Sequence, residues 1–116
     1  ISKSQFVGGE EVERFEMRWA KFNQAKYAIS VGNGLDGLVI ALKSLGIGKG
    51  HKVAVPAHTF IATFNAIEIV GAEPICIDVL SNGLLDVDQF INLRKKVECV
   101  IPVHMHGNIV EIQPRI

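Results

Sequence analysis

The sequence predicts a mixed α/β fold with a mostly parallel sheet. Apolar strand-like segments alternate with segments of helical periodicity along the 116 residues, and a glycine-rich turn joins the first such strand to a helix. This alternation is typical of βαβ units, whose ligands bind beyond the carboxyl ends of the strands. The residues that directly follow each strand are therefore the candidates for a functional site.

Two helices are expected in the first half of the chain. Apolar residues at three- and four-residue steps predict a helix over residues 10–22 with one buried stripe, formed by Val12, Phe15, Trp19 and Phe22. Leucines from Leu35 to Leu45 predict a second helix. Glycines end that helix, at positions Gly46, Gly48 and Gly50.

Two further helices are expected later. Thr59 is the predicted N-cap of a helix from Phe60 to about Val70, which is apolar on most faces and should be buried. Asp86 and Gln89 have the spacing of a capping box, which predicts the start of a fourth helix.

Four strands are expected between these helices. Their predicted bounds are Tyr27–Val31, Lys52–Val55 with a stop at Pro56, Pro74–Val79 and Cys99–Val103.

Composition favours a single domain with small-molecule partners. An apolar content of 48% over 116 residues supports one core but not two. Twelve basic residues balance twelve acidic ones, so nothing indicates nucleic acid or an anionic membrane as a partner. Cys76 and Cys99 lie in apolar strand-like runs and are expected to be small buried side chains, which favours a reducing cytoplasm.

The turn Gly32-Asn33-Gly34-Leu35-Asp36-Gly37 predicts an anion site, most simply for a phosphate. Glycines let the backbone approach a ligand, and the helix N-terminus behind them offers free N–H groups. The run also matches G-x-G-x-x-G, but a dinucleotide site needs an acidic residue after the second strand, where Pro56, Ala57 and His58 stand. A phosphate of another kind is therefore the preferred interpretation.

The histidines provide a rival hypothesis. His104 and His106 follow a predicted strand and could join His58 around a divalent metal, as in metal-dependent hydrolases. No acidic residue or cysteine at another strand end completes a convincing ligand set, so we assign no metal ligand.

Phe60 and Asn65 have two interpretations each. Phe60 either stacks on a planar ligand ring in the cleft or packs in the core, and composition alone favours the core. Asn65, a polar residue in an apolar helix, either faces the cleft or satisfies a backbone group.

The chain resembles the N-terminal part of the DegT/DnrJ/EryC1/StrS family of sugar-nucleotide aminotransferases, from about Phe6 to Glu111. Five blocks occur in the family's order and spacing: 9–16 (GEEVERFE), 32–38 (GNGLDGL), 45–50 (LGIGKG), 55–63 (VPAHTFIAT) and 101–104 (IPVH). Together they are far more specific than the glycine turn alone.

The resemblance implies a pyridoxal 5'-phosphate site. It implies a partial three-layer αβα sandwich, the N-terminal part of the large domain of a fold-type I enzyme. The cofactor phosphate would lie on Gly34, Leu35 and Asp36, and an aromatic ring at Phe60 would stack on the pyridine, which raises the cleft-facing interpretation. Leu35 has no hydroxyl to offer, so backbone N–H groups must hold the phosphate. The resemblance also places Asn65 and His104 near the cofactor.

The resemblance further implies a reaction. Family members transfer an amino group from a donor such as glutamate to a keto-sugar nucleotide in deoxyaminosugar biosynthesis, usually as homodimers. The Gly-Asn-Gly-Leu-Asp variant of the turn is similar to that of members that aminate 3-keto deoxysugar nucleotides.

One departure from the family bears on activity. Family members form a Schiff base through a downstream lysine, and no lysine here lies in that context, whether Lys3, Lys21, Lys26, Lys43, Lys49, Lys52, Lys95 or Lys96. We therefore expect residues 1–116 to be a single incomplete domain that lacks the small C-terminal domain and is inactive alone. The alternative is a non-catalytic remnant or a partner-dependent interaction domain.

Overall fold

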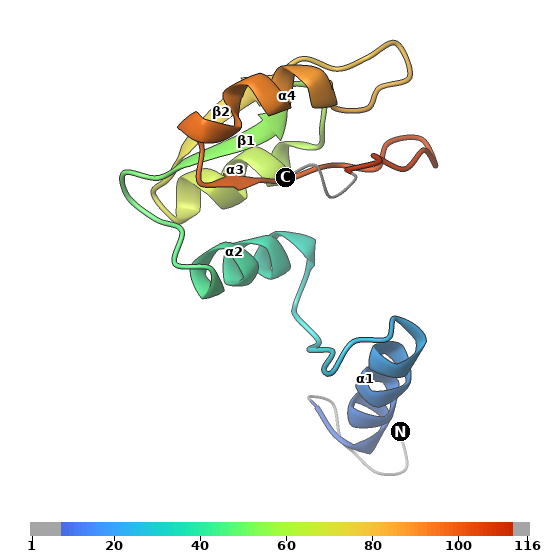
Figure 1. Ribbon diagram of the computed structural model, residues 1–116. Helices are drawn as coiled ribbons and strands as arrows, with labels where there is room; N and C mark the ends of the chain where they lie inside the picture. Colours follow the sequence, from blue (N-terminus) through green and yellow to red (C-terminus); the bar gives the residue numbers. More distant parts are fainter. Residues whose placement is uncertain (1–7, 113–116) are drawn as a thin grey trace. The chain divides into compact units, whose positions relative to one another are not determined.

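The computed structural model describes residues 8–112, which fall into two compact units that divide after Gly32. The first unit holds one helix, and the second holds a sheet with its helices (Figure 1). Within residues 8–112, every helix is too short or too polar to cross a membrane.

The first unit is built on helix α1, Glu10–Phe22, with the bounds that the periodicity predicts. Its first turn carries glutamates and its last turn a lysine, which suits the helix dipole. The prediction that its aromatic stripe is buried is wrong, because Phe15, Trp19 and Phe22 are all more than half exposed. The three rings instead stack on one another along the helix, with centroids 5.8 Å apart.

The predicted strand Tyr27–Val31 is also wrong. These residues pair with no strand in the described part of the chain, and both Tyr27 and Ile29 are exposed. An apolar, β-branched segment becomes a strand only when a neighbour satisfies its backbone groups. Ser30 instead donates its N–H to the Glu16 carboxylate at 2.6 Å.

The second unit contains a parallel sheet of three strands, in the order β2-β1-β3. The strands are β1, Lys52–Pro56; β2, Glu73–Ile77; and β3, Cys99–Val100. Val55 lies opposite Cys76, and Val53 lies opposite Cys99. The parallel pairing confirms the predicted sheet, although β3 is shorter than the predicted Cys99–Val103.

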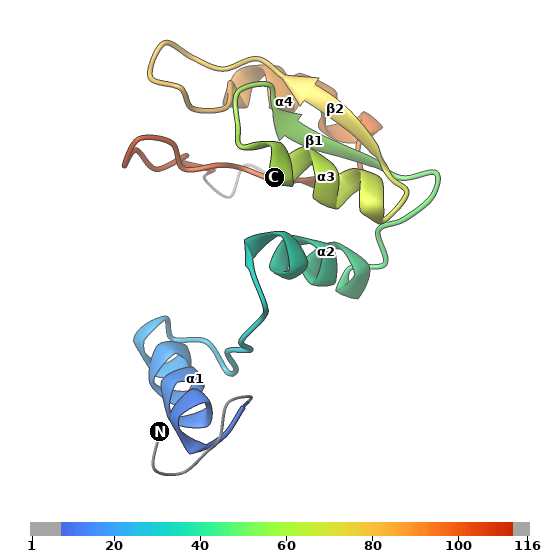
Figure 2. The same ribbon diagram turned by 180° about the vertical axis from the view of Figure 1, so that it is seen from behind.

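Helices cover both faces of this sheet (Figure 2). On one face, Val53 and Val55 pack with helices α2, Gly34–Ser44, and α3, Ile61–Ile69. On the other, Ala54 and Ile77 pack with Phe90 of helix α4, Val87–Leu93, which a short 3₁₀ turn (η1, Arg94–Lys96) follows. The result is the three-layer αβα arrangement that the resemblance implies.

Three local predictions about the second unit need correction. Phe60, not Thr59, is the N-cap of α3, and no side chain caps that helix. Helix α3 is buried along one face only, because Ile61 and Ile69 are exposed on the other. Cys76 is exposed and Cys99 is half-buried, although both were expected to be buried.

Candidate cofactor site

The N-terminus of α2 forms the first wall of the candidate site. Asn33 is the N-cap: its Oδ1 accepts the N–H of Asp36 at 3.0 Å, and its Nδ2 donates to the Asp36 carboxylate at 2.9 Å. The N–H of Gly37 is bonded to the Asn33 carbonyl at 3.1 Å. The amides of Gly34 and Leu35, in contrast, have no acceptor among the described residues, as expected for the first turn of a helix.

The start of α3, together with the loop between β1 and α3, provides the second wall. Parallel pairing with β2 continues one residue beyond β1, because Ala57 donates its N–H to the Ile77 carbonyl at 2.8 Å. The Thr59 and Thr63 hydroxyls lie 3.1 Å apart, which ties the loop to the first turn of α3. The loop thus presents Phe60 outward, with 75% of its surface exposed.

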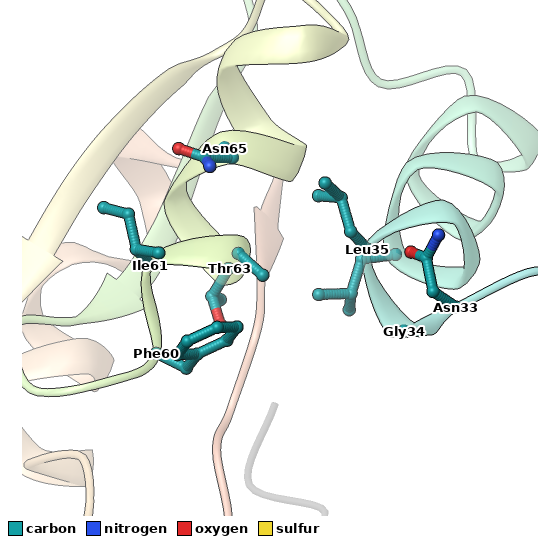
Figure 3. Close-up of a pocket in the computed structure, with 9 residues that line it drawn as sticks. Asn33, Gly34, Leu35, Phe60, Ile61, Thr63 and Asn65 are labelled. Carbon is teal, nitrogen blue, oxygen red and sulfur yellow. The ribbon is translucent and has the colours of Figure 1, made fainter.

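These two walls enclose an open cavity of about 470 Å³ (Figure 3). Leu35 stands on the α2 side, and Phe60 stands across the opening at the start of α3. The cavity is lined by Asn33, Gly34, Leu35, Leu38, Phe60, Ile61, Ala62, Thr63 and Asn65. Its walls are mainly apolar and include no charged side chain, so polar recognition falls to the α2 amides, Thr63 and the two asparagines.

The structure brings together four of the six residues predicted to contact the cofactor. Gly34, Leu35, Phe60 and Asn65 all line the cavity. Asp36 lies in the same first turn of α2, but its N–H is already taken by Asn33. Phe60 therefore faces the cleft rather than the core, contrary to what composition alone favours.

His104 does not line this cavity. Its Nδ1 accepts the N–H of Val110 at 3.1 Å, so in the described part of the chain it holds the segment that follows β3. Residues 8–112 contain no group of three or more His, Cys, Asp or Glu side chains that could hold a metal ion. The hypothesis that His104 and His106 join His58 around the metal of a hydrolase therefore finds no support among these residues.

Sequence reasoning missed four residues of the cavity wall: Leu38, Ile61, Ala62 and Thr63. Leu38 could have been found, because it follows Leu35 by three residues and shares its helix face. Thr63 was not predicted because a threonine within a helix more often forms a hydrogen bond to its own helix than to a ligand.

Similarity to known proteins identifies the family of this chain. A model of the DegT/DnrJ/EryC1/StrS aminotransferase family matches residues 1–114. The chain belongs to that family.

Family relatives resemble the chain over nearly its whole length. A dTDP-3-amino-3,4,6-trideoxy-alpha-D-glucose transaminase of Streptomyces venezuelae is 34% identical over 93% of this chain. A family aminotransferase structure from Brucella abortus covers 94% of it at 32% identity and a TM-score of 0.84. A Bacillus subtilis structure with bound cofactor PMP covers 95% of it at 28% identity and a TM-score of 0.85.

The chain spans a minor part of these relatives. It covers 29% of the Streptomyces venezuelae protein, 32% of the Brucella abortus chain and 26% of the Bacillus subtilis chain. The match of the family model establishes the family of the chain, and the similar structures agree with its α/β fold. The cofactor of the family is pyridoxal phosphate or its amino form.

Proposed function

We propose that this chain forms the phosphate-binding and ring-stacking side of the pyridoxal-phosphate site in a sugar-nucleotide aminotransferase. The observation that carries the proposal is the cavity between the N-terminus of α2 and Phe60, in a chain of this family. The amino acceptor is a keto-sugar nucleotide in deoxyaminosugar biosynthesis, and the donor is an amino acid such as glutamate. The enzyme acts in the cytoplasm as a homodimer.

The residues present fit the cofactor in three respects. The free amides of Gly34 and Leu35 point outward from the positive end of α2, which is the arrangement that binds a phosphate. Phe60 offers an exposed flat face across the same cavity, suited to a planar pyridine ring. Asn65 lines the cavity between these walls and supplies an amide for a polar ring substituent.

The cofactor, when bound, supplies an electron sink for the carbon that exchanges its amino group. The chain's own residues bind and orient it. Gly34 and Leu35 fix the phosphate end, and Phe60 together with Leu35 and Leu38 excludes water from one face of the ring. No lysine lines the cavity. We therefore propose that the lysine that moves protons in the family reaction is not among residues 1–116.

The substrate assignment rests on relatives and on the turn at the start of α2. The Streptomyces venezuelae relative is named for a 3-amino sugar, and another relative at 34% identity, from Aneurinibacillus thermoaerophilus, is a dTDP-3-amino-3,6-dideoxy-alpha-D-galactopyranose transaminase. We propose a 3-keto deoxysugar nucleotide as the acceptor.

Titration with pyridoxal phosphate tests the proposal. The chain should bind it saturably, inorganic phosphate should compete, and Phe60→Ala should weaken binding about tenfold because a ring contact and its buried area are lost. Phe22→Ala is the matched control: that ring is as exposed as Phe60 but belongs to α1.

The outcomes separate the two functional hypotheses. Phosphate-competed binding that weakens in Phe60→Ala and not in Phe22→Ala supports the cofactor site. Equal effects of the two substitutions, or no binding at all, would favour the non-catalytic remnant or partner-dependent domain.

A further inference from the structure

Thr63 combines three properties: its side chain is polar, it is buried, and it forms part of the cavity wall. Within residues 8–112 it is the one polar or charged residue that is buried, with 6% of its surface exposed. It lines the cavity between α2 and Phe60. A buried hydroxyl that lacks a hydrogen-bond partner destabilises the fold, because it has lost its hydration without compensation. The identity of its partner therefore indicates the role of this hydroxyl.

The partner of the Thr63 hydroxyl is the hydroxyl of Thr59, 3.1 Å away in the loop before α3. A threonine within a helix more often bonds to a backbone carbonyl, and a threonine just before a helix more often caps it. Helix α3 has no side-chain cap, so Thr59 does not take that usual role. The two hydroxyls instead bond to each other, one on each side of Phe60 along the chain.

Thr63 also holds the backbone of Phe60. Its N–H donates to the Phe60 carbonyl at 3.0 Å, so Thr63 is bonded both to Phe60 and to the residue before it. The start of the same loop is fixed to the sheet by the bond from the Ala57 N–H to the Ile77 carbonyl. The Phe60 ring is 75% exposed and so has little packing of its own to orient it. The direction in which the ring faces therefore depends on the backbone that these bonds fix.

We propose that Thr63 is a positioning residue, whose hydroxyl acts through Thr59 to hold Phe60 ready to stack on the cofactor ring. The inference rests on the proposed function, because it takes Phe60 as the residue that contacts this ring. It goes further in assigning the strength of the ring contact to a buried hydroxyl that acts on the loop. A loop that is ordered before binding loses less conformational entropy when the ligand arrives, which raises affinity.

The effect should depend on whether the ligand carries a ring. Inorganic phosphate would bind the amides of Gly34 and Leu35, which have no acceptor among the described residues, and it offers nothing for Phe60 to stack on. Pyridoxal phosphate would bind the same amides and contact Phe60 as well. Loss of the Thr63 hydroxyl should therefore weaken the binding of pyridoxal phosphate and leave the binding of inorganic phosphate unchanged.

Thr63→Val tests this in the full chain, because valine keeps the branched shape and removes the hydroxyl. We expect pyridoxal phosphate to bind about fivefold more weakly and inorganic phosphate within about twofold of wild type. Thr63→Ser should restore the affinity for pyridoxal phosphate. In a Phe60→Ala background, Thr63→Val should cause no further loss. Ser44→Ala is the control, since it removes a hydroxyl that bonds to the Ala41 carbonyl at the far end of α2.

A second measurement needs no cofactor. Backbone NMR relaxation gives an order parameter of about 0.85 for rigid amides, and that of the Phe60 amide should fall in Thr63→Val and not in Thr63→Ser or Ser44→Ala. An unchanged order parameter in Thr63→Val, equal losses of affinity for the two ligands, or no recovery in Thr63→Ser overturns the inference. A wild-type chain that binds no pyridoxal phosphate would refute the proposed function, and the relaxation data would still decide whether Thr63 positions Phe60.

Discussion

Asp36 is the residue where charge and proposed function conflict most directly. Its carboxylate lies in the first turn of α2, where it stabilises the helix dipole and accepts a hydrogen bond from Asn33. A phosphate bound to the amides of Gly34 and Leu35 would meet the same positive end and would be repelled by that carboxylate.

Asp36→Asn is therefore expected to bind phosphate more tightly. A charge at a helix end is worth about 0.3–1 kcal/mol, so the dissociation constant for inorganic phosphate should fall about two- to fivefold. The amide oxygen of the new Asn can still accept from Asn33. Calorimetric titration at low salt measures the change, and Asp88→Asn in the first turn of α4 is the matched control. A weaker affinity for phosphate in Asp36→Asn would contradict this electrostatic account.

The two cysteines are expected to differ in reactivity. Burial raises the pKa of the Cys99 thiol, whereas Cys76 is exposed on the edge strand. A raised pKa leaves a smaller fraction of reactive thiolate at any pH below it, so Cys99 should react later than Cys76 and gain rate as the pH rises. Mass-resolved alkylation at pH 7.5 and 9 measures both rates, with Cys76→Ser isolating Cys99. Faster alkylation of Cys99 than of Cys76 would show that this order is wrong.

At the scale of elements, the α2 and α3 helices end in the same way. The N–H of Ile47 bonds to the Leu42 carbonyl and that of Gly46 to the Lys43 carbonyl. Ala72 and Gly71 repeat this pattern after α3, and both glycines have positive φ. These are Schellman motifs, in which a left-handed glycine satisfies the last carbonyls.

Gly46→Ala should therefore lower the free energy of unfolding by about 1–2 kcal/mol, the cost of a left-handed Cβ. Gly34→Ala is the matched control, because neither glycine has an atom within 4 Å of an added Cβ and the φ of Gly34 is not positive. At Gly34, alanine should leave the stability equal or raise it by about 0.5–1 kcal/mol. Urea unfolding followed by circular dichroism compares the two. Equal losses of stability in the two variants would mean that the positive φ of Gly46 does not cause the effect.

Elements whose signals are local are predicted well from this sequence. Helix α1 has the predicted bounds because its periodicity and flanking glycine and asparagine act within the helix. Asp86 caps α4 as expected, since its Oδ1 accepts the Gln89 N–H at 3.0 Å. Tyr27–Val31 failed as a strand because strand formation depends on a neighbour that local sequence does not specify.

The residues of the candidate site also differ in whether local sequence or packing between elements places them. The glycine turn and helix N-terminus are local features, and they predict Gly34 and Leu35 in the cavity. The side on which Phe60 lies depends on how α2 and α3 pack, so composition gave the wrong preference and the family resemblance gave the right one. The approach of the His58 and His106 rings to a centroid distance of 6.2 Å depends on strand order, because β1 and β3 are neighbours in the sheet.

At the scale of the whole molecule, the exposed aromatic stripe of α1 has the largest consequence. Phe15, Trp19 and Phe22 lie on one helix face, and Met17 is exposed on the same helix. A contiguous apolar surface of this kind promotes association, because burying it removes apolar area from water at about 25 cal/mol per Å².

The 116-residue chain is therefore expected to self-associate in a concentration-dependent manner. Sedimentation velocity between micromolar and submillimolar chain should show a rising average mass, and the double substitution Phe15→Gln with Phe22→Gln should shift association to at least tenfold higher concentration. Ile69→Gln controls for general surface polarity, because Ile69 is an equally exposed apolar residue on α3. If the wild-type and the double variant sediment alike, the stripe does not drive association. If only Ile69→Gln shifts association to higher concentration, the surface that drives association lies on α3. The two variants separate the surfaces because each removes apolar area from a different helix.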